Sequence, residues 1–161
     1  MKKWKVYLDT TVISYLDQPE RGEQFADTYR LWEKVKDGVF DVYLSEVTTA
    51  EVNDCKGPKK SILFGYLDQI EYTLIETNER TTTIAQRFID LGILRPKNFD
   101  DCQHIAAAMV SECDVIVSWN FQHIVNHKTM MGVKAITALE GFDDVLIYTP
   151  SVLAGGDDDD I

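Results

Sequence analysis

The sequence predicts an α/β fold in which a mainly parallel β-sheet is covered by helices on both faces. Short β-prone runs alternate along the chain with longer segments whose apolar residues recur at helical spacing. The clearest strand, residues 114–118 (DVIVS), is mostly apolar, as is typical of a parallel strand buried on both faces. Strands that alternate with helices pair in parallel through helical crossovers, so helices are expected on each side of the sheet.

The first part of the chain predicts one strand and two helices. Residues 4–8 (WKVYL) form a β-prone run that ends at Asp9. The two threonines that follow favour the start of a short helix, which ends near Pro19. Residues 22–36 then predict a longer amphipathic helix that Gly38 ends.

The next part predicts a strand, two helices and a third strand. Residues 41–44 are the strand, and Ser45 is a favourable N-cap for a helix over residues 47–55. A second helix is expected at residues 59–70 and a strand at residues 72–75.

The last part predicts two further helices and the strands at the end of the sheet. Residues 81–91 place apolar side chains on one helical face, and the alanine-rich residues 101–113 form a helix that leads into the clearest strand. Residues 121–126 and 134–138 show a weaker periodicity of apolar residues. A short final strand is expected at residues 146–148.

Composition sets the class of the protein and excludes several others. The 161 residues are 45% hydrophobic and 27% charged, which fits one globular domain, expected over residues 1–154. Residues 155–161 include four consecutive aspartates and are expected to be a disordered acidic tail. No apolar run approaches the ~20 residues of a membrane span, and Asp9 interrupts any signal-peptide pattern.

Charge and cysteine content limit the partners and the compartment. Three cysteines without a CxxC pair disfavour a disulfide framework and a thiolate zinc site, so a cytoplasmic location is expected. The formal net charge of −11 excludes a broad basic face for long duplexes. A nucleic-acid substrate would be bound over a short stretch or with the help of metal ions.

Four polar residues fall at strand ends or helix starts on one edge of the predicted sheet. Asp9 ends the first strand, Glu51 follows the second, Asp101 begins the helix before the clearest strand, and Asn120 follows that strand. Ligands of open α/β sheets bind beyond the carboxyl ends of the strands, so these side chains are candidates for a common site.

Two of the carboxylates have neighbours that compete for the same role. Helical periodicity places Asp101 on the inward face with His104 beside it, whereas Asp100 suits the N-cap. Glu51 shares the inward face of its helix, whereas Glu46 in the first turn suits the helix dipole.

Asp9, Glu51 and Asp101 have no basic partner in their motifs and would repel one another. A divalent cation with oxygen ligands, Mg²⁺ or Mn²⁺, would resolve that repulsion and could activate a water molecule for phosphodiester hydrolysis. The simpler interpretation makes Asp9 and Asp101 helix caps and Glu51 a solvated residue.

Four segments resemble the PIN domain, particularly the VapC-like toxin ribonucleases. They are VYLDTTVIS at 6–14, LSEVTTAEV at 44–52, DCQHIAAA at 101–108 and DVIVSWNFQHIVN at 114–126. The resemblance implies a three-layer α/β/α sandwich and a metal-dependent endoribonuclease that cleaves RNA. It implies that Asp9, Glu51 and Asp101 are the acidic metal-site positions. It also implies a cognate antitoxin protein and a homodimer.

Asn120 departs from the family pattern, which often has a fourth acidic residue after this strand. An amide can hold a metal-bound water but brings no charge, so a single-metal site or a weaker enzyme is expected. The alternative is a PIN-fold module that binds RNA or protein without turnover. A third interpretation is a small phosphatase or nucleotide hydrolase that uses the same carboxylates.

Other residues have both a structural and a functional interpretation. His123 and His127 are spaced as a zinc pair on a helix, but no third ligand is nearby in sequence. His104 is expected to be a satisfied core histidine, and Trp119 a packed residue at the rim of the site. The basic clusters are solvated surface residues or phosphate contacts: Lys56, Lys59 and Lys60, and separately Arg95 and Lys97.

Overall fold

A single sheet organises the protein, for which the computed structural model describes residues 2–155. Within this range it has five strands in the order β3-β2-β1-β4-β5, and every neighbouring pair is parallel. The strands are β1 (Lys5–Leu8), β2 (Asp41–Ser45), β3 (Thr73–Ile75), β4 (Val115–Val117) and β5 (Leu146–Tyr148).

The strand order contains one reversal, between β1 and β4. The chain runs outward from β1 through β2 to β3, and then returns to the other side of β1 for β4 and β5. In open parallel sheets the crevice beyond the carboxyl ends at such a switch point is where ligands bind. Asp9, the residue after β1, and Ser118, the residue after β4, lie at this position.

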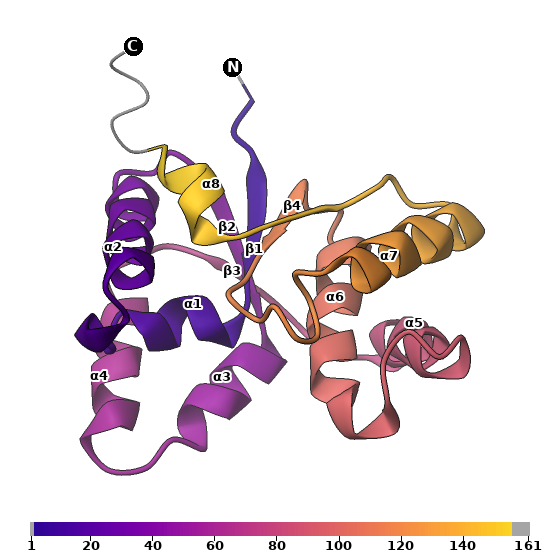
Figure 1. Ribbon diagram of the computed structural model, residues 1–161, viewed down its shortest axis with the longest axis horizontal. Coiled ribbons are helices and arrows are strands. Elements are labelled where there is room, and N and C mark those ends of the chain that lie inside the picture. Colours follow the sequence, from indigo (N-terminus) through magenta and orange to yellow (C-terminus); the bar gives the residue numbers. More distant parts are fainter. Residues whose placement is uncertain (1, 156–161) are drawn as a thin grey trace.

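Helices cover both faces of the sheet, which confirms the predicted three-layer α/β/α sandwich. Figure 1 shows α1 to α4 and α8 on one side of the strands and α5 to α7 on the other. The helices are α1 (Thr10–Tyr15), α2 (Glu23–Lys36), α3 (Glu46–Asn53), α4 (Pro58–Leu67), α5 (Glu79–Asp90), α6 (Phe99–Val110), α7 (His127–Glu140) and α8 (Pro150–Ala154), with short 3₁₀ turns at Pro19–Arg21 and Pro96–Asn98.

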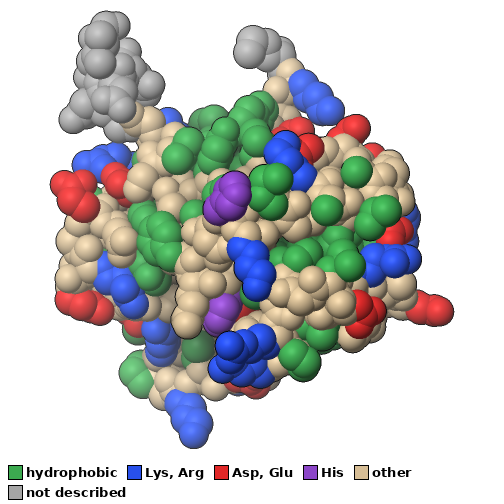
Figure 2. Space-filling model, turned by 45° about the vertical axis from the view of Figure 1, so that its right-hand side comes forward, with side chains coloured by type: hydrophobic (Ala, Val, Ile, Leu, Met, Phe, Trp, Pro, Cys, Tyr) green, Lys and Arg blue, Asp and Glu red, His purple; other side chains and the backbone are tan. Residues whose placement is uncertain are grey.

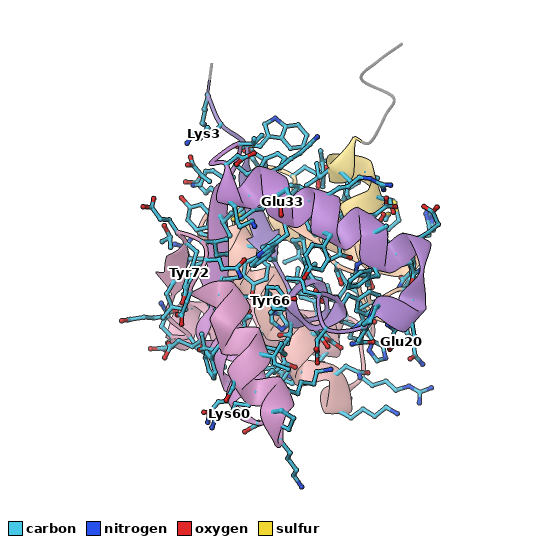
Figure 3. The ribbon with its side chains drawn as sticks, turned by 90° about the vertical axis from the view of Figure 1, so that its left-hand side faces the viewer. Lys3, Glu20, Glu33, Lys60, Tyr66 and Tyr72 are labelled. Atoms are coloured by element: carbon cyan, nitrogen blue, oxygen red, sulfur yellow. The ribbon has the colours of Figure 1, made fainter. Side chains whose placement is uncertain are left out.

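Two apolar cores lie between these layers, and β1 contributes to both. Val6 and Leu8 face α1 to α4, whereas Tyr7 faces α5 and α6, as the alternation of side chains along a strand requires. Trp32 on α2 and Phe88 on α5 are fully buried in opposite cores. On the first side, Figure 3 shows Tyr66 of α4 beneath α2, where its hydroxyl lies 2.5 Å from that of Tyr29.

The observed helix starts agree only in part with those predicted from the sequence. Ser45 caps α3 as predicted, because its hydroxyl accepts a hydrogen bond from Val47 N. The prediction that Asp100 caps α6 is wrong. The 3₁₀ turn Pro96–Asn98 leads directly into the helix, so Asn98 is the N-cap and Asp100 lies exposed in the first turn.

The segment after β4 also differs from expectation. Residues 121–126 form turns, and α7 begins only at His127. His123 therefore precedes the helix, and the spacing of His123 and His127 does not place both on one helical face. The short helix α8 after β5 was not predicted from the sequence.

No helix within residues 2–155 is long and apolar enough to cross a membrane. The predicted acidic tail, apart from Gly155, lies outside the described residues. All three cysteines are free thiols, and burial raises the pKa of Cys102 to about 12 and that of Cys113 to about 11. These two cysteines are buried packing residues of the core between the sheet and helices α5 to α7.

Candidate functional site

Asp9 lies at the centre of the switch point and is almost completely buried. It caps α1, since its Oδ1 accepts hydrogen bonds from the backbone and the hydroxyl of Thr11 at 3.1 and 2.5 Å. Its Oδ2 accepts a bond from Ser118 Oγ at 2.7 Å, which joins the ends of β1 and β4. Burial raises the pKa of the Asp9 carboxyl, with a contribution from the charge of Glu51, against the lowering effects of His104 and of the two hydroxyls.

Glu51 projects from α3 toward the start of α1 and the middle of α6. Its Oε1 accepts hydrogen bonds from Thr10 Oγ1 and His104 Nε2, both at 2.6 Å. Burial acts to raise its pKa, but the hydrogen bond and positive charge of His104 and the hydrogen bond of Thr10 outweigh this effect and lower the pKa. Glu51 is therefore an ionised carboxylate bound to an imidazole, rather than a solvated residue.

His104 is the hub of a buried chain of hydrogen bonds. Only 2% of its surface is exposed, and its Nδ1 lies 2.6 Å from Tyr7 Oη, which in turn lies 2.7 Å from Ser45 Oγ. Burial opposes a charge on the imidazole, but Tyr7, Glu51 and Asp9 together raise the pKa of His104 well above its ordinary value. The predicted core histidine is present, and its raised pKa favours the protonated imidazole beside Glu51.

Asp101 lies in the first turn of α6, facing the loop that follows β4. Its Oδ2 is 3.0 Å from Nδ1 of His123, and its Oδ1 is 3.4 Å from Nδ2 of Asn120. Burial raises the pKa of Asp101, and the charges of Asp9 and Glu51 raise it further, whereas His104 and His123 lower it.

Asn120 connects the site to its loop. Its Oδ1 accepts a bond from His123 N at 2.9 Å, and its own backbone N–H donates to Ser118 Oγ at 2.9 Å. Ser118 thus links Asn120 to Asp9, while the amide of Asn120 faces Asp101. The carboxylates have no basic partner in their own motifs, but Glu51 and Asp101 each pair with an imidazole from another segment of the chain.

Some of these residues were not predicted to belong to the site. Ser118, Thr11 and His123 act through hydrogen bonds that no periodic pattern in the sequence reveals. The available signal is the spacing: His104 follows Asp101 by three residues, and His123 follows Asn120 by three. Trp119 is buried and stacks on Tyr15, with 5.5 Å between ring centroids, so it is a packed residue as predicted.

The chemistry of the donors fits a hard divalent cation. Burial raises the pKa of Asp9 and of Asp101, and the charges of Asp9 and Glu51 raise the pKa of Asp101 further. A bound cation would relieve that cost. Within residues 2–155, no three His, Cys, Asp or Glu side chains are already grouped as a ligand set. Metal binding would therefore replace some of the present protein hydrogen bonds.

Comparison with known proteins identifies the fold. No protein-family model and no curated protein sequence matches the chain. A chain of the crystal structure of VapBC2 from Rickettsia felis, bound to a DNA fragment from their promoter, is similar over 90% of this chain and 98% of that chain, with a TM-score of 0.56 and 14% sequence identity. The chain has a PIN-like fold. Asp9 follows β1 at the switch point of this sheet, Ser118 and Asn120 follow β4, and Glu51 lies on α3, which follows the neighbouring strand β2.

Proposed function

We propose that this protein is a metal-dependent endoribonuclease, the VapC-like toxin of a type II toxin–antitoxin pair. The observation that carries the proposal is that Ser118 and Asn120 link Asp9 to Asp101 by hydrogen bonds. Glu51, held by Thr10 and His104, is close enough for its charge to act on both of these carboxylates. The structural similarity to VapBC2 supports the assignment to this class. It also supports a cognate antitoxin as partner, and we extend the proposal to a homodimer.

Mg²⁺ or Mn²⁺ is the cofactor in this proposal, held by Asp9, Glu51 and Asp101. Such an ion supplies a water of lowered pKa and neutralises charge on a phosphate oxygen. Hydrolysis by water would leave a 5′-phosphate and a 3′-hydroxyl. Because Asn120 brings no charge, the site favours one ion rather than two.

The other residues of the site orient these carboxylates. Thr11 and Ser118 fix both oxygens of Asp9, and Asn120 and His123 hold those of Asp101. His104 holds Glu51 through its Nε2. Ligands that are fixed in advance lose less freedom when the reaction geometry forms.

The experiment is cleavage of a structured RNA by the purified protein with Mg²⁺ or Mn²⁺. Asp9→Asn and Asp101→Asn are expected to abolish cleavage while the variants remain folded. Asp100→Asn is the matched control, since this neighbouring carboxylate is exposed and has the same charge. Equal cleavage by wild type, Asp9→Asn and Asp101→Asn would identify a contaminating nuclease and refute the proposal.

A second candidate is a PIN-fold module that binds RNA or protein without turnover. The neutral Asn120 and the two imidazole–carboxylate pairs favour it, because both reduce the negative charge available to a cation. Titration calorimetry with Mn²⁺ distinguishes the two. Binding that Asp101→Asn removes supports the enzyme, and no heat of binding at millimolar Mn²⁺ supports the module.

A further inference from the structure

A cleft of about 470 Å³ opens directly beside the candidate site. One wall is the segment between α5 and α6, and the other is the segment between β4 and α7 together with the first turn of α7. His123 belongs to both the cleft and the site, because it lines the cleft and bonds Asp101. A ligand bound in the cleft would therefore lie against His123, the residue that pairs with Asp101.

The charge of this cleft is opposite to that of the whole chain. Arg95, Lys97 and Lys128 line it, and no Asp or Glu among the described residues does so. None of these three cations forms an ion pair or a side-chain hydrogen bond with any other residue between 2 and 155. On a chain of net charge −11, unpaired positive side chains gathered in one cleft fit a polyanion.

Figure 2 shows a face of the molecule on which lysine and arginine side chains alternate with histidine side chains down the middle of the surface. By contrast, another cleft, of about 760 Å³ at the opposite edge of the sheet, mixes Lys3 and Lys36 with Asp37, Asp41 and Glu71. That mixture carries no preference for an anion.

An aromatic ring also faces the cleft. Phe121 is 50% exposed although it is a large apolar residue, and its ring lies 6.2 Å from that of Trp119. Trp119 is itself fixed by the stack on Tyr15 and by a 2.8 Å hydrogen bond from Nε1 to Thr28. Phe121 is thus the exposed end of a supported row of rings, which suits the stacking of a nucleobase.

Hydrogen bonds within the loop and to the start of α7 fix the conformation of the loop that carries Phe121. Asn126 Nδ2 donates to the carbonyls of Phe121 and Gln122, both at 3.1 Å, while Asn126 Oδ1 caps α7 through Thr129 N. Thr129 Oγ1 donates to the carbonyl of His123 at 2.7 Å. These bonds hold the ring and the histidine on the same wall of the cleft.

We propose that this cleft binds an unpaired RNA segment, with a base stacked on Phe121 and phosphates at Arg95, Lys97 and Lys128. This inference rests on the proposed function and deepens it, since it names the cleft and the side chains that would hold the RNA beside the candidate site. In a duplex the bases already stack on one another, so an exposed ring gains little, whereas an unpaired base is free to stack on it.

The test is binding of a labelled single-stranded RNA of about 12 nucleotides to the full chain, in EDTA so that no cleavage occurs. Phe121→Ala is expected to weaken binding by about fivefold or more, and Phe121→Tyr to restore it. Arg95→Ala/Lys97→Ala/Lys128→Ala is expected to weaken it on the order of tenfold and to reduce the slope of log affinity against log salt by about 2. A duplex of the same length is expected to bind more weakly.

Two matched controls lie away from the cleft. Lys56→Ala/Lys59→Ala/Lys60→Ala makes the same charge change around the start of α4, and Figure 3 shows Lys60 on the side of the molecule that carries α2 and α4. Tyr72→Ala removes an aromatic ring of comparable exposure beside β3. Both are expected to retain wild-type affinity, and melting curves check that every variant is folded.

Wild-type affinity in Phe121→Ala and in the cleft triple variant would overturn the inference and leave the cleft to a protein partner. An equal loss in the control triple variant, or tighter binding of the duplex, would also overturn it. These outcomes are separate from the proposed activity. RNA binding without cleavage in Mn²⁺ would refute the enzyme alone, whereas cleavage with a KM unchanged by the cleft variants would refute the cleft alone.

Discussion

His104 Nε2 and Glu51 Oε1 lie 2.6 Å apart, although the two residues are 53 positions apart in the sequence and belong to different helices. The contact ties α6 to α3 across the carboxyl edge of the sheet. It also places an imidazole with a raised pKa among the carboxylates of the site.

Removal of this pair is expected to destabilise the protein. His104→Ala leaves the half-buried Glu51 carboxylate without its imidazole and removes the partner of Tyr7 Oη. The loss of a fully buried pair costs about 3–5 kcal/mol, and because the Glu51 side chain is 36% exposed we expect about 2 kcal/mol here. Urea unfolding of His104→Ala, Glu51→Gln and the double variant measures the coupling. Additive effects of the two single changes would contradict it.

The pair of His104 and Glu51 is expected to stabilise the folded protein most over a limited range of pH. The lowered pKa of Glu51 gives stability above its unfolded value of about 4.5, which is lost as pH falls through the folded pKa. The raised pKa of His104 gives stability below its unfolded value of about 6.5, which is lost as pH rises through the folded pKa. The difference in unfolding free energy between wild type and His104→Gln/Glu51→Gln is therefore expected to be largest between these values. A difference independent of pH would show that the pair is not ionised.

Asp9→Asn is expected to stabilise the metal-free protein at neutral pH. The folded pKa of Asp9 is raised, so its ionisation above the unfolded value of about 3.8 costs stability that a neutral amide does not lose. Asparagine is also a good helix N-cap, so the gain is on the order of 1 kcal/mol. Thermal melts near neutral pH check this, and the advantage is expected to vanish in acid, where Asp9 is protonated.

A bound metal ion is expected to make wild type more stable than Asp9→Asn. Binding to the folded state alone adds about 2.7 kcal/mol at a concentration of about 100 times Kd, so Mn²⁺ would raise the melting temperature of wild type and EDTA would return it. Asp9→Asn and Asp101→Asn are expected to lose this shift, and Asp100→Asn to keep it. A shift of equal size in all four proteins would indicate nonspecific binding of the ion.

Two glycines predict opposite effects of added side chains. A Cβ on Gly132 of α7 would lie 2.5 Å from Ile93 Cδ1 and 2.9 Å from Cγ2, so Gly132→Ala is expected to cost about 1–3 kcal/mol. A Cβ on Gly65 of α4 meets nothing within 4 Å, so Gly65→Ala is expected to gain about 0.5–1 kcal/mol. Chemical denaturation of both variants compares the signs. Ile93→Ala in the Gly132→Ala background should recover part of the loss.

The strands and most helices followed from patterns that are local in the chain. Buried parallel strands such as Val115–Val117 are short apolar runs, and Ser45 is a cap by its own chemistry. The start of α6 was misplaced because a 3₁₀ turn ahead of the helix took the role given to Asp100. The capping preference of a residue can be inferred from its type, but the conformation of the turn before it cannot.

The carboxylates of the site were predictable because strand ends of a parallel sheet share an edge. The partners of these carboxylates were not, since a hydrogen bond such as that from Ser118 to Asp9 depends on which strand lies next to β1. Strand order is decided by the packing of the whole chain. For the same reason His104 was expected only as a core residue, and its bond to Glu51 came from the structure.

The position of β4 has a consequence for synthesis of the protein. This strand lies beside β1 at the middle of the sheet, yet it is made only after about 70% of the chain. While the chain is still being synthesised, the edge of β1 that pairs with β4 is therefore unpaired. The growing chain also lacks Ser118 and Asn120 until late in translation. If the protein cleaves RNA, this order of synthesis leaves the site incomplete, and the nascent chain inactive, until β4 has been made.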